Sequence, residues 1–250
     1  ARAAANRALD LDPELAEGRA ITGSIAFYHD WDWETARREL TRAIELNPGL
    51  ASAHQAYGDY LEVLGRWSES IVVGKRSVEV DPISAHMRAN LGLTYNMARR
   101  FEDARASCES ALELDPQDSW AWYCVADSHH GSGNLEQAIA AAERGLELDP
   151  DEPVLQIILA REYDAVGRRD EAQEILESLE TRSQSEYVSP FYLAWIHTHL
   201  GNHDEALAYL DQAVTSRAAY TPWINSEPDF DSLRDDPRFE DLLRRMNLAK

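Results

Sequence analysis

The chain has 250 residues and a strong excess of acidic side chains. It contains 45 aspartates and glutamates against 24 lysines and arginines, which gives a formal net charge of -21. This charge repels phosphate backbones and anionic lipid surfaces, so we expect neither nucleic acid nor a membrane as a partner. No apolar run approaches the roughly 20 residues that cross a bilayer, and Ala1 to Leu11 lack the features of an export signal. We therefore expect a folded, soluble, cytoplasmic protein.

Three columns of residues repeat along the chain with a step of 34. The first column is proline, at Pro48, Pro82, Pro116 and Pro150. The second holds small side chains, at Ala36, Ser70, Ala104, Ala138, Ala172 and Ala206. The third is mostly glycine, at Gly65, Arg99, Gly133, Gly167 and Gly201. Because 34 residues accommodate two helices and two short turns, the period predicts a stack of helical hairpins.

In chain order, the period predicts a half-unit followed by six hairpins. Residues 1–16 supply only a second helix, and the hairpins occupy residues 17–50, 51–84, 85–118, 119–152, 153–186 and 187–218. The first hairpin carries an extra residue in its turn, His29-Asp30-Trp31-Asp32-Trp33. Residues 219–250 break the period. We expect an irregular segment there, with Trp223 and Phe230 helping to seal the last repeat, and then a capping helix that begins at Asp236 and Pro237.

The columns also predict how each hairpin is built. Glycine between the two helices can take a positive φ and end the first helix. Asn134 and Asn202 follow this column and are expected to cap the second helices with their side chains. The small column on the second helices lets neighbouring helices approach closely.

These positions resemble the tetratricopeptide-repeat family over roughly residues 2–218. The resemblance implies an all-α, right-handed superhelix of hairpins that binds other proteins. The register also includes the segments DWDW, YVSPFYLAWIHTHLG and DPRFEDLLRRM. With them it is similar to the carboxy-terminal repeat regions of bacterial signalling proteins, which follow a serine/threonine kinase, a nucleotide cyclase or a winged-helix regulator. This implies a part of a larger signalling or regulatory protein.

In a stack of such hairpins the first helices line the concave groove, and four positions of each are expected to face it. The candidate partner-binding residues are Gln55, Asp59, Glu62, His86, Asn96, Trp120, Tyr123, Asp127, His130 and Arg161. Trp120 and Tyr123 are rigid side chains of the kind that anchor interfaces, although Trp120 could instead pack between hairpins. Because acidic side chains face this groove and lysine does not, we expect a basic or neutral peptide rather than a terminal carboxylate.

The sequence contains no catalytic or cofactor-binding motif, and we predict neither an enzyme nor a cofactor. His129 and His130 are adjacent on a helix and point about 100° apart, so no metal site is expected. Carboxylates are numerous on this acidic surface, and none is expected to pair in an apolar pocket that raises a pKa. Cys108 and Cys124 are expected to be buried free thiols.

The favoured function is therefore an interaction scaffold that holds a peptide or protein segment in the concave groove. An alternative is self-association, because the half-unit at the N-terminus presents an apolar edge that includes Leu9 and Leu11 and that a second copy could cover.

Overall fold

The computed structural model describes residues 1–248, and over these residues it is helical with no strand. The prediction of an all-α fold is confirmed. In chain order the elements are α1 (Arg2–Leu11), α2 (Ala16–Ile25), the π-helical turn η1 (Ala26–Asp30), α3 (Trp33–Leu46), α4 (Ala51–Val63), α5 (Trp67–Val80), α6 (Ala85–Met97), α7 (Phe101–Leu114), α8 (Ser119–Gly131), α9 (Leu135–Leu148), α10 (Pro153–Ala165), α11 (Arg169–Ser183), α12 (Pro190–His199), α13 (His203–Ser216), the 3-10 helices η2 (Thr221–Asn225) and η3 (Pro228–Leu233), and α14 (Pro237–Arg245).

The turn inside each hairpin adopts the left-handed conformation that the glycine column predicts. Gly65, Gly133, Gly167 and Gly201 have φ values of 68°, 75°, 84° and 76°, and Arg99 takes the same place with a φ of 57°. The prediction for the asparagines was wrong in one respect. Asn134 and Asn202 precede the second helices, but their side chains make no capping hydrogen bond. Their backbone N–H groups instead close the preceding helices, on the carbonyls of His129 and His197.

The extra residue of the first hairpin is absorbed by the wider turn η1. Trp31 follows η1 with a φ of 56°, the conformation that glycine adopts in later hairpins. Asp32 then begins α3, and its carboxylate accepts a hydrogen bond from the Thr35 N–H at 3.0 Å. An insertion is thus tolerated without disturbing the helices on either side.

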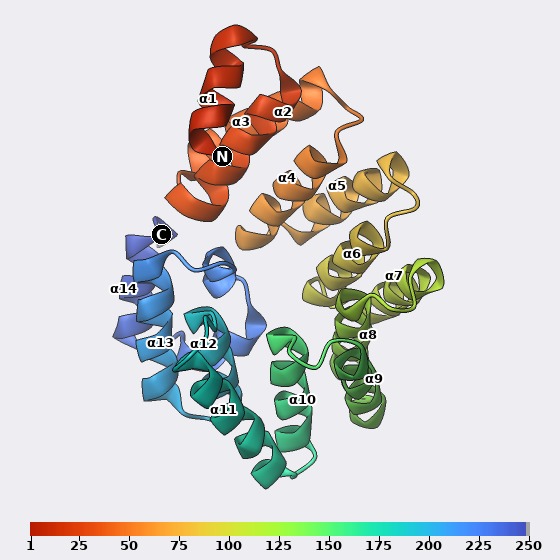
Figure 1. The fold of residues 1–250 in the computed structure, drawn as a ribbon, viewed down its shortest axis with the longest axis vertical. Helices are drawn as coiled ribbons and strands as arrows, with labels where there is room; N and C mark the ends of the chain where they lie inside the picture. The colour runs from red at the N-terminus through yellow and green to blue at the C-terminus, as the bar shows by residue number, and fades with distance from the viewer. Residues whose placement is uncertain (249–250) are drawn as a thin grey trace.

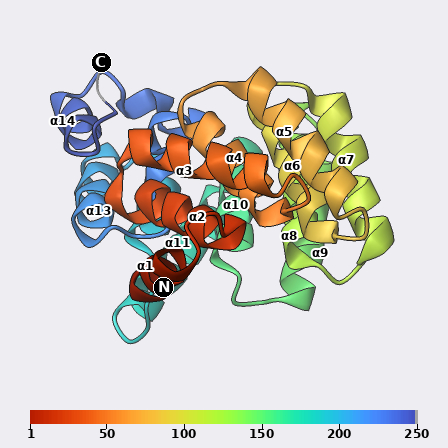
Figure 2. The same cartoon turned by 90° about the horizontal axis from the view of Figure 1, so that it is seen from above.

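The hairpins follow one another around a nearly closed ring, and the C-terminal part of the chain returns to the first hairpin (Figure 1; Figure 2). The indole N–H of Trp33 donates to the Met246 carbonyl at 2.9 Å. The Arg217 guanidinium donates to the carbonyl of His29 and lies 4.4 Å from the centre of the Trp31 ring. These contacts join residues that are roughly 190 to 210 positions apart in the sequence.

The C-terminal segment, residues 219–233, seals the last repeat and also reaches the first. Phe230 is fully buried, and its ring centre lies 5.5 Å from that of Phe191 in α12, as the sealing role predicts. Trp223 does not seal the last repeat as expected. Its ring packs on Phe27 of η1, with centres 5.5 Å apart. The reason is the left-handed backbone of Arg217 and Tyr220, which reverses the chain after α13. Beyond this segment, α14 begins at Pro237, and Asp236 caps it by accepting a hydrogen bond from the Arg238 N–H.

The two cysteines form a disulfide, so the prediction of free thiols was wrong. Cys108 lies in α7 and Cys124 in α8, with their Cα atoms 5.5 Å apart, and both are fully buried. The sequence indicated that these helices pack together, and their close packing brings the two sulfur atoms within bonding distance. Both sulfur atoms lie over Gly92 of α6, where the absence of a side chain makes room for them.

We expect Gly92→Ala to destabilise the protein by about 1–3 kcal/mol, because overpacking a core costs this much. A Cβ there would lie 2.5 Å from the Cys124 sulfur and 2.6 Å from the Cys108 sulfur. Gly58→Ala is the matched control, since Gly58 is 34 residues earlier and a Cβ would meet the Ser70 hydroxyl at 3.6 Å. Gly58→Ala should leave the free energy of unfolding unchanged or raise it by up to about 1 kcal/mol. Urea unfolding followed by circular dichroism measures both, and equal stabilities would contradict the packing described.

Candidate functional site

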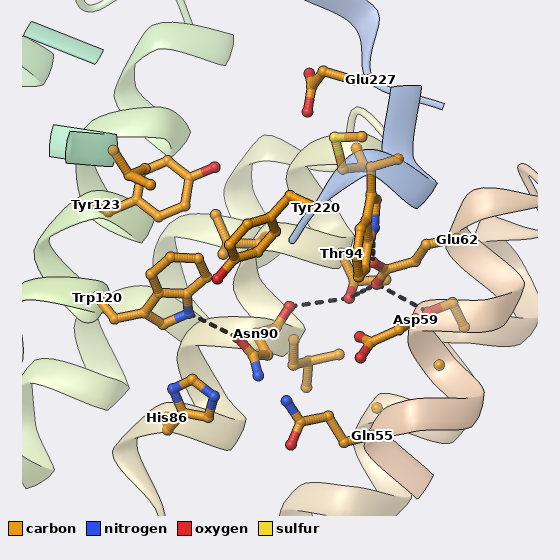
Figure 3. A pocket seen from close by; sticks show the side chains of 18 of the residues that line it. Gln55, Asp59, Glu62, His86, Asn90, Thr94, Trp120, Tyr123, Tyr220 and Glu227 are labelled. Atoms are coloured by element: carbon orange, nitrogen blue, oxygen red, sulfur yellow. Dashed lines mark hydrogen bonds between the residues drawn. The ribbon is translucent and has the colours of Figure 1, made fainter. Parts of the chain in front are cut away.

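The concave side of the ring holds a cavity of about 350 Å³, walled by α4, α6 and α8 and by the C-terminal segment (Figure 3). The residues that line it include Tyr28, Gln55, Asp59, Glu62, His86, Asn90, Thr94, Trp120, Tyr123, Tyr220, Trp223 and Glu227. The volume lies toward the lower end of the range for ligand pockets, about 300–1,000 Å³. The cavity is therefore large enough for a side chain or a short segment, but not for a long peptide.

The structure divides the ten predicted groove residues into two groups. Six of them line the cavity: Gln55, Asp59, Glu62, His86, Trp120 and Tyr123. The other four belong to a buried ion-pair network beside the cavity: Asn96, Asp127, His130 and Arg161. The division follows from the C-terminal segment, which brings further acidic residues against α8 and α10.

Trp120 forms the centre of an aromatic wall. Its indole N–H donates to the Asn90 side-chain carbonyl at 2.7 Å, which fixes the plane of the ring. The ring centre lies 4.9 Å from that of Tyr123, 6.1 Å from that of His86 and 6.5 Å from that of Tyr220. Trp120 remains half-buried, with its ring on the cavity. Trp120 therefore contacts the neighbouring hairpin, as the alternative expected, and also lines the cavity.

Two carboxylates from α4, three residues apart, face the same cavity. Glu62 accepts hydrogen bonds from the Thr94 hydroxyl at 2.6 Å, the Ser70 hydroxyl at 3.2 Å and the Trp223 indole N–H at 3.3 Å. These three donors come from three different elements and fix the Glu62 side chain. Asp59 accepts from the Tyr28 hydroxyl, and within residues 1–248 no other side chain donates to it.

The pKa values of both carboxyls in this pair are raised. Burial, together with the neighbouring Glu62 carboxylate, raises the pKa of Asp59 to about 8. Burial also raises the pKa of Glu62, in spite of its three donors. The expectation that no carboxylate pair would lie in such a pocket was therefore wrong. The aromatic rings that desolvate the pair come from Tyr28, Tyr220 and Trp223. Tyr28 holds the place in the first hairpin that Glu62 holds in the second, and the other two residues follow the repeats.

Arg161 is held in the ion-pair network and is not free to bind a ligand. It is 7% exposed, and its guanidinium lies 2.9 Å from Glu162, 3.2 Å from Asp127 and 3.4 Å from Asp229. Burial alone would lower the pKa of Arg161, but these carboxylates raise it. Arg161 was expected among the partner-binding residues, but its charge is paired inside the protein.

The other two members of the network are equally engaged. The Asn96 amide donates to Asp127 at 3.1 Å, and His130 Nδ1 lies 2.9 Å from the Glu162 carboxylate. Asp229, which comes from η3, also accepts from the Trp195 indole N–H at 2.8 Å. The network thus ties the C-terminal segment to α8, α10 and α12.

The predicted site did not include the residues that close the cavity, namely Tyr28, Tyr220, Trp223 and Glu227. Tyr28 lies 34 residues before Glu62, so the repeat frame assigns it to the groove, but the candidates were taken from later hairpins only. The other three lie in the segment after the repeats, where the 34-residue frame gives no orientation. The composition of that segment was the available indication of an aromatic contact surface, since the run AYTPW places two aromatic residues within four positions. Within residues 1–248, no three or more histidine, cysteine or acidic side chains are grouped to hold a metal. No helix in that part of the chain is long and apolar enough to cross a membrane.

Replacing Arg161 should be strongly destabilising, because it leaves three carboxylates without their cation. We expect Arg161→Met to lower the free energy of unfolding by about 3–5 kcal/mol, the usual cost of breaking a buried ion pair. Arg168→Met removes the same charge from an exposed arginine that pairs with Glu171, and should change stability little. Thermal unfolding of both variants makes the comparison. Similar melting temperatures would show that the network contributes no net stability.

Replacing Asp59 should change how stability depends on pH. Because folding raises its pKa, the folded state holds this proton to a higher pH than the unfolded chain does. Stability is then fully present below the ordinary pKa near 4 and is lost as the pH rises through about 8. Asp59→Asn removes that loss, so its melting temperature should gain on wild type between pH 5 and pH 9. A difference that stays constant over this range would contradict a raised pKa.

Comparisons with known proteins relate the chain to helical-repeat proteins. Sequence models of the tetratricopeptide repeat match residues 95–162, 129–189 and 192–219. No curated protein matches the chain. Among solved structures, Pseudomonas aeruginosa pilF is 17% identical to this chain with a TM-score of 0.57. The match covers 89% of this chain and 97% of the pilF chain. YrrB, described as a TPR protein with an unusual peptide-binding site, is 18% identical to this chain with a TM-score of 0.52. The match covers 83% of this chain and 98% of the YrrB chain.

A third structure, the APC/C hetero-tetramer Cut9-Hcn1, is 15% identical with a TM-score of 0.65. The match covers 97% of this chain and 45% of that chain. At these identities the likeness concerns the fold. The 34-residue period, the hairpins that it forms and the matching repeat models together show that the chain belongs to the tetratricopeptide-repeat family.

Proposed function

We propose that the protein is an interaction scaffold that holds a short segment of a partner protein in the cavity on its concave side. The observation that carries the proposal is the aromatic and polar lining of that cavity, which stays open to solvent. Tyr28 and Tyr220 at the cavity are 38% and 37% exposed. Helical-repeat solenoids present concave surfaces of this kind to their partners. The peptide-binding site named for the structurally similar YrrB supports the same role.

The expected ligand is a short segment rather than an extended peptide along the whole groove. The C-terminal segment lies across the concave side, where Trp223 reaches η1 and Phe230 covers α12. What remains accessible is the cavity beside Trp120 and Tyr123. Rigid aromatic side chains in a concave site are the usual anchors of an interface, so one or two partner side chains would supply most of the affinity.

The lining favours a basic or neutral segment. Asp59, Glu62 and Glu227 are among the residues around the cavity, and within the described part of the chain no lysine or arginine lines it.

The proposed role is binding without catalysis and without a cofactor, within a larger signalling or regulatory protein. The proposed location is the cytoplasm. Burial of both sulfur atoms of the Cys108–Cys124 bond would limit its reduction by cellular thiols.

Self-association through α1 is a second candidate, favoured by the exposure of Leu11. This side chain is 72% exposed. Leu9, which was expected to share that apolar edge, is half-buried, and its Cδ2 atom lies against Gly18 of α2. The apolar edge is therefore narrower than the sequence indicated.

The test is selection of short peptides from a phage-displayed library, followed by measurement of their affinity for three purified forms. Gln55→Trp fills the cavity, and Gln173→Trp makes the same change at an exposed site on α11. We expect selected peptides to bind wild type and Gln173→Trp alike and to lose about tenfold or more with Gln55→Trp, a change of at least 1.4 kcal/mol.

Two results would overturn the proposal. Peptides that bind all three forms equally would place the site elsewhere. A selection that enriches nothing, with light scattering that shows a stable dimer, would favour self-association instead.

A further inference from the structure

We propose that the cavity is specific for the cationic side chain of an arginine in the bound segment, with Asp59 as its counter-ion and the ring of Trp120 or Tyr220 as its stacking surface. This inference rests on the proposed function and adds the chemistry of the anchor. It differs from a general preference for basic partners, because it assigns one side chain to one enclosed position.

Asp59 is the carboxylate that is available for a ligand. Its one donor is the Tyr28 hydroxyl, among the side chains of residues 1–248. A carboxylate has two oxygens and about four acceptor positions, so most of the acceptor capacity of Asp59 remains unused. Glu62, by contrast, is already fixed by three donors. An arginine fork fits a carboxylate with free positions, because it donates two parallel hydrogen bonds.

The aromatic residues are arranged to accept a flat cation. The rings of Trp120 and Tyr220 lie at 25° to each other with centres 6.5 Å apart. Figure 3 shows Tyr220 between the Trp120 side of the cavity and the side that carries Asp59 and Glu62. A guanidinium is planar and weakly hydrated, so it stacks on such rings better than an ammonium does.

The charge balance around the cavity separates it from the neighbouring network. The carboxylates beside Arg161 are neutralised inside the protein, whereas Asp59 and Glu62 have no arginine or lysine beside them in the lining. The titratable groups that act on Asp59 are Tyr28 from η1, Glu62 from its own helix and Tyr220 from the C-terminal segment, and His54 and His86 line the same cavity. Neither the tyrosines nor Glu62 supplies a positive charge. A bound cation would supply it and would displace the proton that Asp59 otherwise retains.

The experiment measures binding of two defined peptides, acetyl-Gly-Ser-Arg-Ser-Gly-amide and the same peptide with neutral citrulline in place of arginine. Isothermal titration is carried out at 150 mM salt with wild type, Asp59→Asn and Glu113→Gln. Glu113 is exposed on α7, so this control removes one negative charge from the protein without touching the cavity. A third peptide with lysine tests the preference for a planar cation.

We expect the arginine peptide to bind wild type about tenfold more tightly than the citrulline peptide. Asp59→Asn should abolish this difference, and Glu113→Gln should preserve it. Affinity for the arginine peptide should rise from pH 6 to pH 9, because fewer Asp59 carboxyls then need to lose a proton on binding.

Three results would overturn the assignment: equal binding of arginine and citrulline peptides, equal binding of the lysine peptide, or the same loss in both carboxyl variants. Failure here is distinguishable from failure of the proposed function. If library peptides still lose affinity with Gln55→Trp, the cavity binds a partner segment whose anchor is not arginine. If no library peptide does so, the scaffold proposal itself fails.

Discussion

The closure of the solenoid onto its own first hairpin is the constraint on which the rest of the structure depends. Trp223 carries much of it, because its ring packs on Phe27 while its indole N–H donates to Glu62. Without this segment the concave side would be an open groove with solvated carboxylates. With it, the groove becomes a partly covered cavity, and the same side chains experience a less polar environment. Backbone topology and electrostatics are therefore linked through one aromatic residue.

Closure places partly or fully buried carboxylates in two different settings. In the network, Asp127, Glu162 and Asp229 surround Arg161, and the protein provides its own cation. In the cavity, Asp59 and Glu62 have hydroxyl and indole donors but no cation. Desolvation penalises an ionised carboxylate unless a positive charge or several donors compensate for it. The first setting ties the C-terminal segment to α8, α10 and α12, and the second keeps a site that a cationic ligand can complete.

The repeat period predicted what depends on local geometry. The left-handed turn at Gly133 and the buried small side chain at Ala138 both follow from a residue's place in the 34-residue unit. The period also placed Asp59 and Trp120 correctly on the concave side, because every first helix presents the same positions there. It could not place Trp223 or Glu227, since these follow the last repeat and their positions depend on how far the stack has turned. It also could not show that Arg161 pairs with Asp229, which lies in that same segment.

Glu62 connects the cavity with the contact that closes the ring. Its carboxylate receives Trp223 from the closing segment and also borders the space beside Asp59. A cation in the cavity favours ionised carboxylates, and an ionised Glu62 is the better acceptor for the indole N–H. Whatever binds the closed form more tightly than an open one stabilises closure by mass action. Occupancy of the cavity and closure of the solenoid are therefore expected to strengthen each other.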